Sequence, residues 1–235
     1  MVSQPVQIET AGSLPLFAKT AHLGDQAYDH LRELILSRQI SGGTELPEGR
    51  LAERLNVSRT PMREALVRLV GEGLLQRASD RAYRVRSVST REFFECMQLR
   101  ELLECDAIEK AVRVVTDEGL AGLRRDLLAL SQAGEDDMQH WRFDNQFHSF
   151  FARAAGHALL ADTITRMRVI ARLFRISSAL HRQGEIDGEH LAILEAVERR
   201  DAEAAKAAML AHLRNLQDDV RRAIAAETDP GGYAS

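Results

Sequence analysis

Residues 58–66, with the sequence SRTPMREAL, constrain the fold of this chain more than any other segment. Ser58 can accept hydrogen bonds from the backbone donors of a first helical turn, and Pro61 lacks a donor that would have no partner there. The pair predicts a helix that begins near residue 59, capped by the Ser58 hydroxyl. Arg59 and Arg63 lie one turn apart on one face. Apolar residues recur at the spacing of a buried face: Leu66, Leu69 and Val70.

A second short helix is expected directly upstream, over residues 48–55 (EGRLAERL), with residues 56–58 as the turn between the two helices. Its inward-facing residues are Leu51, Ala52 and Leu55. Two short helices joined by a tight turn form a helix-turn-helix, whose second helix lies in the major groove of DNA. Residues 23–36 predict a third helix. Residues 77–88 predict a two-stranded wing around a turn at residues 79–81.

Positive charge is concentrated in this front part of the chain. Residues 50–86 carry nine arginines and four acidic residues, although the whole chain has a net charge of -4. Arginine serves both phosphate contacts and contacts to guanine edges. Double-stranded DNA is therefore the expected partner of this part. The alternative for any single arginine is a solvated side chain or a salt bridge within its helix, such as Arg59 with Glu64 or Arg50 with Glu53.

The remainder of the chain predicts a bundle of antiparallel helices, so the expected fold class is mostly α. The helices are expected over residues 90–115, 118–133, 138–155, 158–180, 186–199 and 202–227. The expected organisation is a disordered tail (1–22), a winged helix-turn-helix domain (23–88), an all-helical domain (89–228) and a second disordered tail (229–235).

No apolar stretch approaches the length of about 20 residues that a membrane-spanning helix needs. The two cysteines, Cys96 and Cys105, lie nine residues apart on one predicted helix and cannot bond to each other within it. Neither belongs to a paired-cysteine metal motif. A cytoplasmic protein with no membrane partner is therefore expected.

Four potential metal ligands occur in the predicted bundle. Asp144 and His148 are four residues apart and project from one helix face, while His190 and His212 lie on two later helices. Facing helices of a bundle can bring such side chains to one point. One carboxylate and three imidazoles suit zinc, nickel or another divalent transition metal, and they leave coordination positions for water or a ligand oxygen.

The front part resembles the GntR family of winged-helix transcription factors. The resemblance rests on a gap-free match to the family pattern LxExRLAExLxVSRTPxREALxxLxxEGL over residues 46–74. It implies that DNA is bound by the motif and by the tip of the wing, through Arg50, Ser58, Arg59, Thr60, Arg63 and Arg81.

The helical part resembles the effector-binding FCD domain of the FadR subfamily, on the segments DNQFH at 144–148, EHLAIL at 189–194 and Met209 with His212-Leu213. The resemblance implies a metal on Asp144, His148, His190 and His212, and an acid-binding cavity faced by Arg100. Arg168, Arg172 and Arg175 are weaker candidates for that role, because their facing cannot be read from the sequence.

Together these features predict a ligand-responsive repressor that is not an enzyme. It is expected to bind a palindromic operator as a homodimer and to sense a small organic acid. Two alternatives stay open at this point. The metal could be structural or absent, with a different effector. A metal-dependent hydrolase is the other, with Glu189 as its general base.

Overall fold

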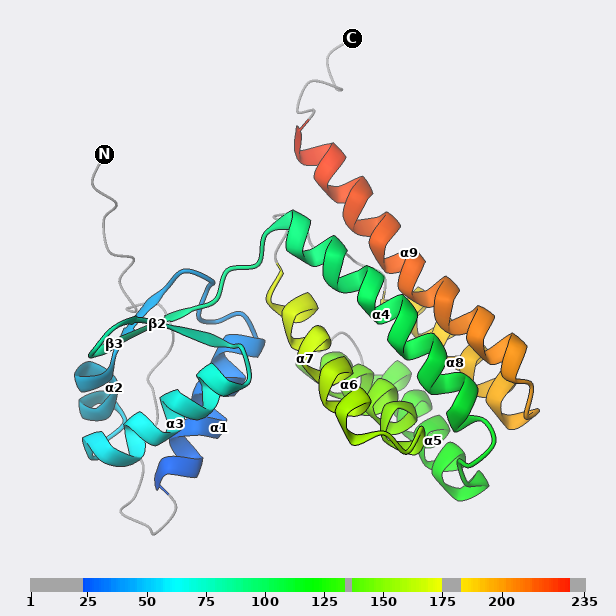
Figure 1. Cartoon of the computed structure of the whole chain (residues 1–235), viewed down its shortest axis with the longest axis horizontal. Helices are drawn as coiled ribbons and strands as arrows, with labels where there is room; N and C mark the ends of the chain where they lie inside the picture. Colours follow the sequence, from blue (N-terminus) through cyan, green and yellow to red (C-terminus); the bar gives the residue numbers. More distant parts are fainter. Residues whose placement is uncertain (1–22, 134–136, 175–182, 229–235) are drawn as a thin grey trace. The chain divides into compact units, whose positions relative to one another are not determined.

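A computed structural model describes residues 23–133, 137–174 and 183–228 of the chain (Figure 1). The two tails expected to be disordered lie outside the described residues. The described residues form two compact units: the part up to Ser89 together with Arg172–Phe174, and the rest of the chain from Thr90 onward. None of the described helices combines the length and the apolar character that crossing a membrane requires.

The first unit contains three helices and a small antiparallel sheet. The helices are α1 (Leu23–Leu36), α2 (Glu48–Arg54) and α3 (Arg59–Gly71), and the strands are β1 (Glu45–Pro47), β2 (Leu75–Ser79) and β3 (Ala82–Val85). The sheet order is β1-β3-β2, so the expected wing, β2 with β3, is extended by a third strand. Strand β1 was not expected. It pairs Leu46 with Tyr83, and both side chains are buried.

Helix α3 begins at Arg59, as the sequence predicts, but the expected serine cap does not form. Ser58 has the extended backbone of an N-cap residue, yet its hydroxyl makes no capping hydrogen bond. The side chain is exposed, so water competes for the hydroxyl. Backbone bonds hold the turn instead: the Val57 amide donates to the Ala52 carbonyl at 2.9 Å, and Asn56 takes a left-handed conformation (φ 53°) that asparagine tolerates.

Helices α1 and α3 are joined by polar contacts in addition to their apolar ones. The Arg68 guanidinium lies 3.8 Å from the centre of the Tyr28 ring and donates to Asp25 at 2.6 Å. The Tyr28 hydroxyl donates to Glu72, the residue that follows α3. Burial is the main cause that raises the pKa of Tyr28 to about 12, and the Glu72 carboxylate adds to it. The hydroxyl therefore stays protonated and can donate. These contacts hold α3 against α1, while Arg59 and Arg63 on α3 stay exposed.

The second unit is a helical bundle, as expected, built from six described helices. They are α4 (Thr90–Ala111), α5 (Asp117–Ala133), α6 (Asp137–Ala154), α7 (Ala158–Leu173), α8 (Gln183–Glu198) and α9 (Ala202–Thr228). Helix α4 packs on α6 and α9, and α8 packs between α5 and α9 (Figure 1). Small and aliphatic side chains join α4, α6 and α7: Ala107, Ala152, Ala161 and Ile164.

Two helix ends differ most from the sequence-based boundaries. Helix α4 ends at Ala111, although the apolar pattern continues to residue 115. The Arg200 guanidinium donates to the carbonyls of Val112 and Val115, at 3.0 and 2.8 Å, and so satisfies backbone acceptors beyond the helix end. Helix α7 ends at Leu173, and the last residues of the range predicted for it, 175–180, lie outside the described residues.

Candidate metal centre and basic surface

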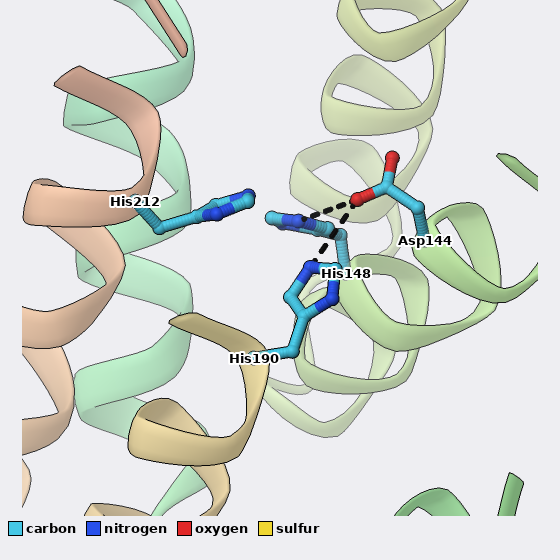
Figure 2. Close-up of side chains that lie close together, drawn as sticks. All are labelled: Asp144, His148, His190 and His212. Atoms are coloured by element: carbon cyan, nitrogen blue, oxygen red, sulfur yellow. Dashed lines mark ion pairs between the residues drawn. The ribbon is translucent and has the colours of Figure 1, made fainter. Parts of the chain in front are cut away.

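The four expected ligands lie together inside the bundle, as Figure 2 shows. Asp144 and His148 come from α6, His190 from α8 and His212 from α9, and each offers a donor atom within 4.8 Å of the others. The two α6 residues share one face because they are four residues apart. The packing of α8 on α9 supplies the remaining two imidazoles. The four side chains named from the sequence are therefore neighbours in space.

Asp144 is the hub of the cluster. Its Oδ1 lies 3.4 Å from Nε2 of His148 and 3.3 Å from Nε2 of His190, and its Oδ2 accepts a hydrogen bond from Nη2 of Arg168 at 2.5 Å. Burial by itself would raise the pKa of Asp144. The Arg168 guanidinium and the two histidines nevertheless hold it well below its ordinary value. The carboxylate is therefore ionised and aimed at the imidazoles.

Two of the histidines, His148 and His190, are short of hydrogen-bond partners. Burial lowers the pKa of both His190 and His212, which leaves ring lone pairs available near pH 7. Nε2 of His148 and both ring nitrogens of His190 are buried without a hydrogen bond. An unsatisfied buried polar atom is costly, so several around one carboxylate indicate a missing partner. This donor set fits a divalent transition metal.

Two of the imidazoles are oriented by carboxylates behind them. Nδ1 of His148 is bonded to Glu104, and Nδ1 of His212 lies 2.8 Å from Glu189, whose other oxygen accepts from Asn215 at 2.7 Å. Such contacts fix the ring tautomer and leave the opposite nitrogen for the cluster. Glu189, which the hydrolase alternative treats as a general base, is thus engaged in holding His212.

Arg100, the arginine expected to face an acid-binding cavity, is buried in a salt bridge. Its Nε donates to Glu104 at 2.6 Å and its Nη1 contacts the Met97 sulfur at 3.5 Å. Burial by itself would raise the pKa of Glu104. Arg100 and His148 instead hold it well below its ordinary value. The guanidinium therefore neutralises the acid that orients His148.

Among the described residues, the arginine that contacts the cluster is Arg168 on α7, which the sequence placed behind Arg100. Its side chain is 2% exposed, and besides Asp144 it contacts the Asn145 side-chain oxygen at 3.4 Å. Its Nη1 is buried without a hydrogen-bond partner. A sequence signal was present: Ala161, Ile164 and Arg168 follow the three-to-four spacing of one buried helix face.

The expected DNA-binding residues lie on one unit and are exposed. They are Arg50 on α2, Ser58 and Thr60 at the start of α3, Arg59 and Arg63 on α3, and Arg81 in the turn between β2 and β3. Arg63 differs from the others because it pairs with Glu48, with Nε to Oε2 at 2.9 Å and Nη2 to Oε1 at 3.0 Å. The sequence had indicated Arg59–Glu64 and Arg50–Glu53 as possible pairs, and not this one.

Two family models match the chain: the FCD domain over residues 95–215, and the bacterial regulatory proteins of the gntR family over residues 23–85. The HTH-type transcriptional repressor RspR of Escherichia coli (strain K12) is 29% identical over 209 residues, covering 86% of this chain and 91% of that protein. The Uxu operon transcriptional regulator of the same organism is 30% identical over 216 residues, covering 80% and 82%. Among solved structures, E. coli McbR/YncC matches with a TM-score of 0.72 at 26% identity, covering 86% of this chain and 99% of that one.

Proposed function

Because this chain belongs to the GntR family of bacterial regulatory proteins, and carries an FCD domain, we propose that it is a repressor released from its operator by a small carboxylic acid. The chain is a DNA-binding transcriptional regulator and not an enzyme. The acid is proposed to bind inside the bundle, at the cluster of Asp144, His148, His190 and His212. The observation that carries the proposal is the set of buried nitrogens there that have no hydrogen-bond partner.

The four side chains are proposed to hold zinc or nickel. One carboxylate and three imidazoles are ligands that both metals accept, and the carboxylates behind His148 and His212 keep those rings in the required tautomer. A metal bound there would supply a Lewis-acid position for one carboxylate oxygen of the effector.

Arg168 is proposed to take the second carboxylate oxygen of the effector, in place of Arg100. Its Nη1 is a buried donor without a partner, next to the cluster, whereas Arg100 is committed to Glu104. Charge also favours an anion. Three carboxylates (Asp144, Glu104, Glu189) face two guanidiniums (Arg100, Arg168), so a divalent cation leaves one positive charge uncompensated.

The experiment that tests this function is a thermal-shift screen of small carboxylic acids against zinc-loaded, nickel-loaded and chelator-stripped protein. A ligand that binds only the native state raises the melting temperature. At a concentration about 100 times its Kd, it raises the free energy of unfolding by about 2.7 kcal/mol. We expect at least one acid to stabilise the protein only when metal is present. The absence of an acid-dependent shift from all samples would instead support a structural metal and a different effector.

Replacement of Arg168 by methionine is expected to weaken acid binding by about 10- to 150-fold, since a hydrogen bond to a charged group contributes about 1.5–3 kcal/mol. Isothermal titration of the metal-loaded variant measures this loss, with metal content determined on the same sample. Arg166→Met is the matched control, because Arg166 lies on the same helix with an exposed side chain. Unchanged acid affinity in metal-loaded Arg168→Met would remove this residue from the site.

The protein is proposed to act in the cytoplasm as a homodimer on a palindromic operator. One small DNA-binding domain buries a modest area of DNA. Two such domains related by a two-fold axis double the contacts and match a palindrome. Multi-angle light scattering at micromolar concentration should therefore give roughly twice the 26.3 kDa of one chain. A mass of one chain under these conditions would contradict the dimer.

A further inference from the structure

The Glu48 carboxylate lies among the arginines that are expected to meet DNA. It is the first residue of α2, and its side chain is 4% exposed. Its two oxygens accept from Nε and Nη2 of Arg63, on the recognition helix α3, at 2.9 and 3.0 Å. A two-point pairing of this kind fixes the plane of a guanidinium as well as its position.

The backbone of Glu48 makes a second connection, to the tip of the wing. Its amide donates to the carbonyl of Arg81 at 3.1 Å, in the turn between β2 and β3. The preceding residue, Pro47, ends β1 and pairs in register with Ala82 of β3. One residue thus connects α2, the recognition helix and the wing tip, the three elements that carry the expected DNA contacts.

A purely structural salt bridge would account for the burial of Glu48 but not for the position of Arg63. The Arg63 side chain is 57% exposed and lies on the same face of α3 as Arg59. The carboxylate holds Nε and Nη2, which leaves Nη1 and the second N–H of Nη2 as donors that this pair does not use. The pairing also neutralises an acid that would otherwise repel phosphates, and it restricts the rotamers of Arg63 before DNA binds.

We propose that Glu48 is a positioning residue for sequence recognition: it holds Arg63 in the orientation that reads a base edge and fixes the wing tip relative to the recognition helix. The inference rests on the proposed contact between Arg63 and DNA. The chemistry of a fixed guanidinium favours guanine, which presents O6 and N7 as two acceptors in the major groove. Glu48 therefore supports the preference for one G·C pair in each half-site.

The test is selection of random duplex DNA by full-length wild-type protein and by Glu48→Gln, Arg63→Ala and the double variant. Glutamine keeps the size and one acceptor oxygen of Glu48 but removes its charge, and the backbone bond to Arg81 is unaffected. We expect Arg63→Ala to lose the preference at one base pair per half-site. Glu48→Gln should weaken the same preference by about tenfold and leave the other positions unchanged. The double variant should lose no more than Arg63→Ala, because both changes act on one contact.

Glu53→Gln is the matched control, since Glu53 is an exposed acid on the same helix, and it should reproduce the wild-type profile. Glu48→Asp provides a second variant if Glu48→Gln does not fold. It keeps the charge but shortens the reach to Arg63, and it should weaken the same base pair.

The possible outcomes separate this inference from the proposed function. A wild-type profile in Glu48→Gln, beside an altered one in Arg63→Ala, would overturn the positioning role. A uniform loss of affinity with a lower melting temperature and unchanged base preferences would also overturn it, in favour of a structural role. An unaltered profile in Arg63→Ala would remove the contact on which the inference rests. Failure of the wild-type protein to select any palindrome would count against the proposed operator itself.

Discussion

Replacing His190 and His212 together by alanine is expected to abolish metal-dependent acid binding. The two imidazoles come from α8 and α9, and without them only Asp144 and His148 remain of the four donors within 4.8 Å of one another. Loss of an outer-shell partner alone lowers metal affinity by about 10- to 100-fold, so loss of two direct ligands should exceed that range. Metal content after dialysis and isothermal titration with the acid identified by the thermal-shift screen measure both effects.

His157→Ala is the matched control for this experiment. His157 lies outside the cluster with an exposed side chain, so its removal changes the histidine count without touching the site. Circular dichroism of both variants should show the same helix content, because the bundle is built mainly by apolar contacts. Acid binding that still depends on metal in the His190 and His212 double variant would refute the proposed mechanism.

Replacing Arg59 by alanine is expected to weaken DNA binding by about 5- to 150-fold, the range that corresponds to 1–3 kcal/mol for one specific contact. Arg59 is exposed at the first position of the recognition helix, where it is well placed to reach either a phosphate or a base edge. Salt dependence distinguishes the two. Loss of a phosphate contact lowers the slope of log K against log salt by about 0.9, while loss of a base contact relaxes the preference at one position.

Fluorescence anisotropy with the duplex selected by the wild-type protein measures this affinity over a range of salt concentrations. Arg125→Ala is the control, because this substitution removes the same charge from an exposed position on α5, in the second unit. Equal affinities of wild type and Arg59→Ala at every salt concentration would exclude a contact between this residue and DNA.

Most helices were predictable because their apolar residues follow one period and their ends carry distinct signals. The range predicted for α1 agrees with the observed helix, and the observed start of α3 follows the serine and proline at residues 58 and 61. Strand β1 escaped prediction because three residues are too few to show an alternating pattern. Its position depends on the burial of Leu46 opposite Tyr83, which is a contact between residues 37 positions apart.

The candidate site was predictable to the extent that it follows from spacing within a helix. Asp144 and His148 are one turn apart, so their shared face could be read directly, whereas the approach of His190 and His212 depended on family resemblance. The sequence ranks Arg100 above Arg168 as the acid-binding residue, whereas we propose Arg168 from its place beside the cluster. Arg100 donates to Glu104 at 2.6 Å and Arg168 donates to Asp144 at 2.5 Å, and both contacts depend on how the helices pack in the folded chain. The Glu48–Arg63 pair joins two helices and was hidden for the same reason.

The imidazole nitrogens of His148 and His190 that make no hydrogen bond have a consequence for how chelation experiments are interpreted. Each unsatisfied buried polar atom costs about 1–3 kcal/mol, which is a large part of the net stability of a typical domain. With the proposed metal as the partner of these nitrogens, a chelated sample is expected to melt earlier and to be cleaved faster by proteases in the bundle than the loaded form. Weak effector binding by such a sample would partly reflect a population of opened molecules. Protein for DNA-binding assays should accordingly be purified with metal present, and chelated samples compared only at temperatures well below their own melting transition.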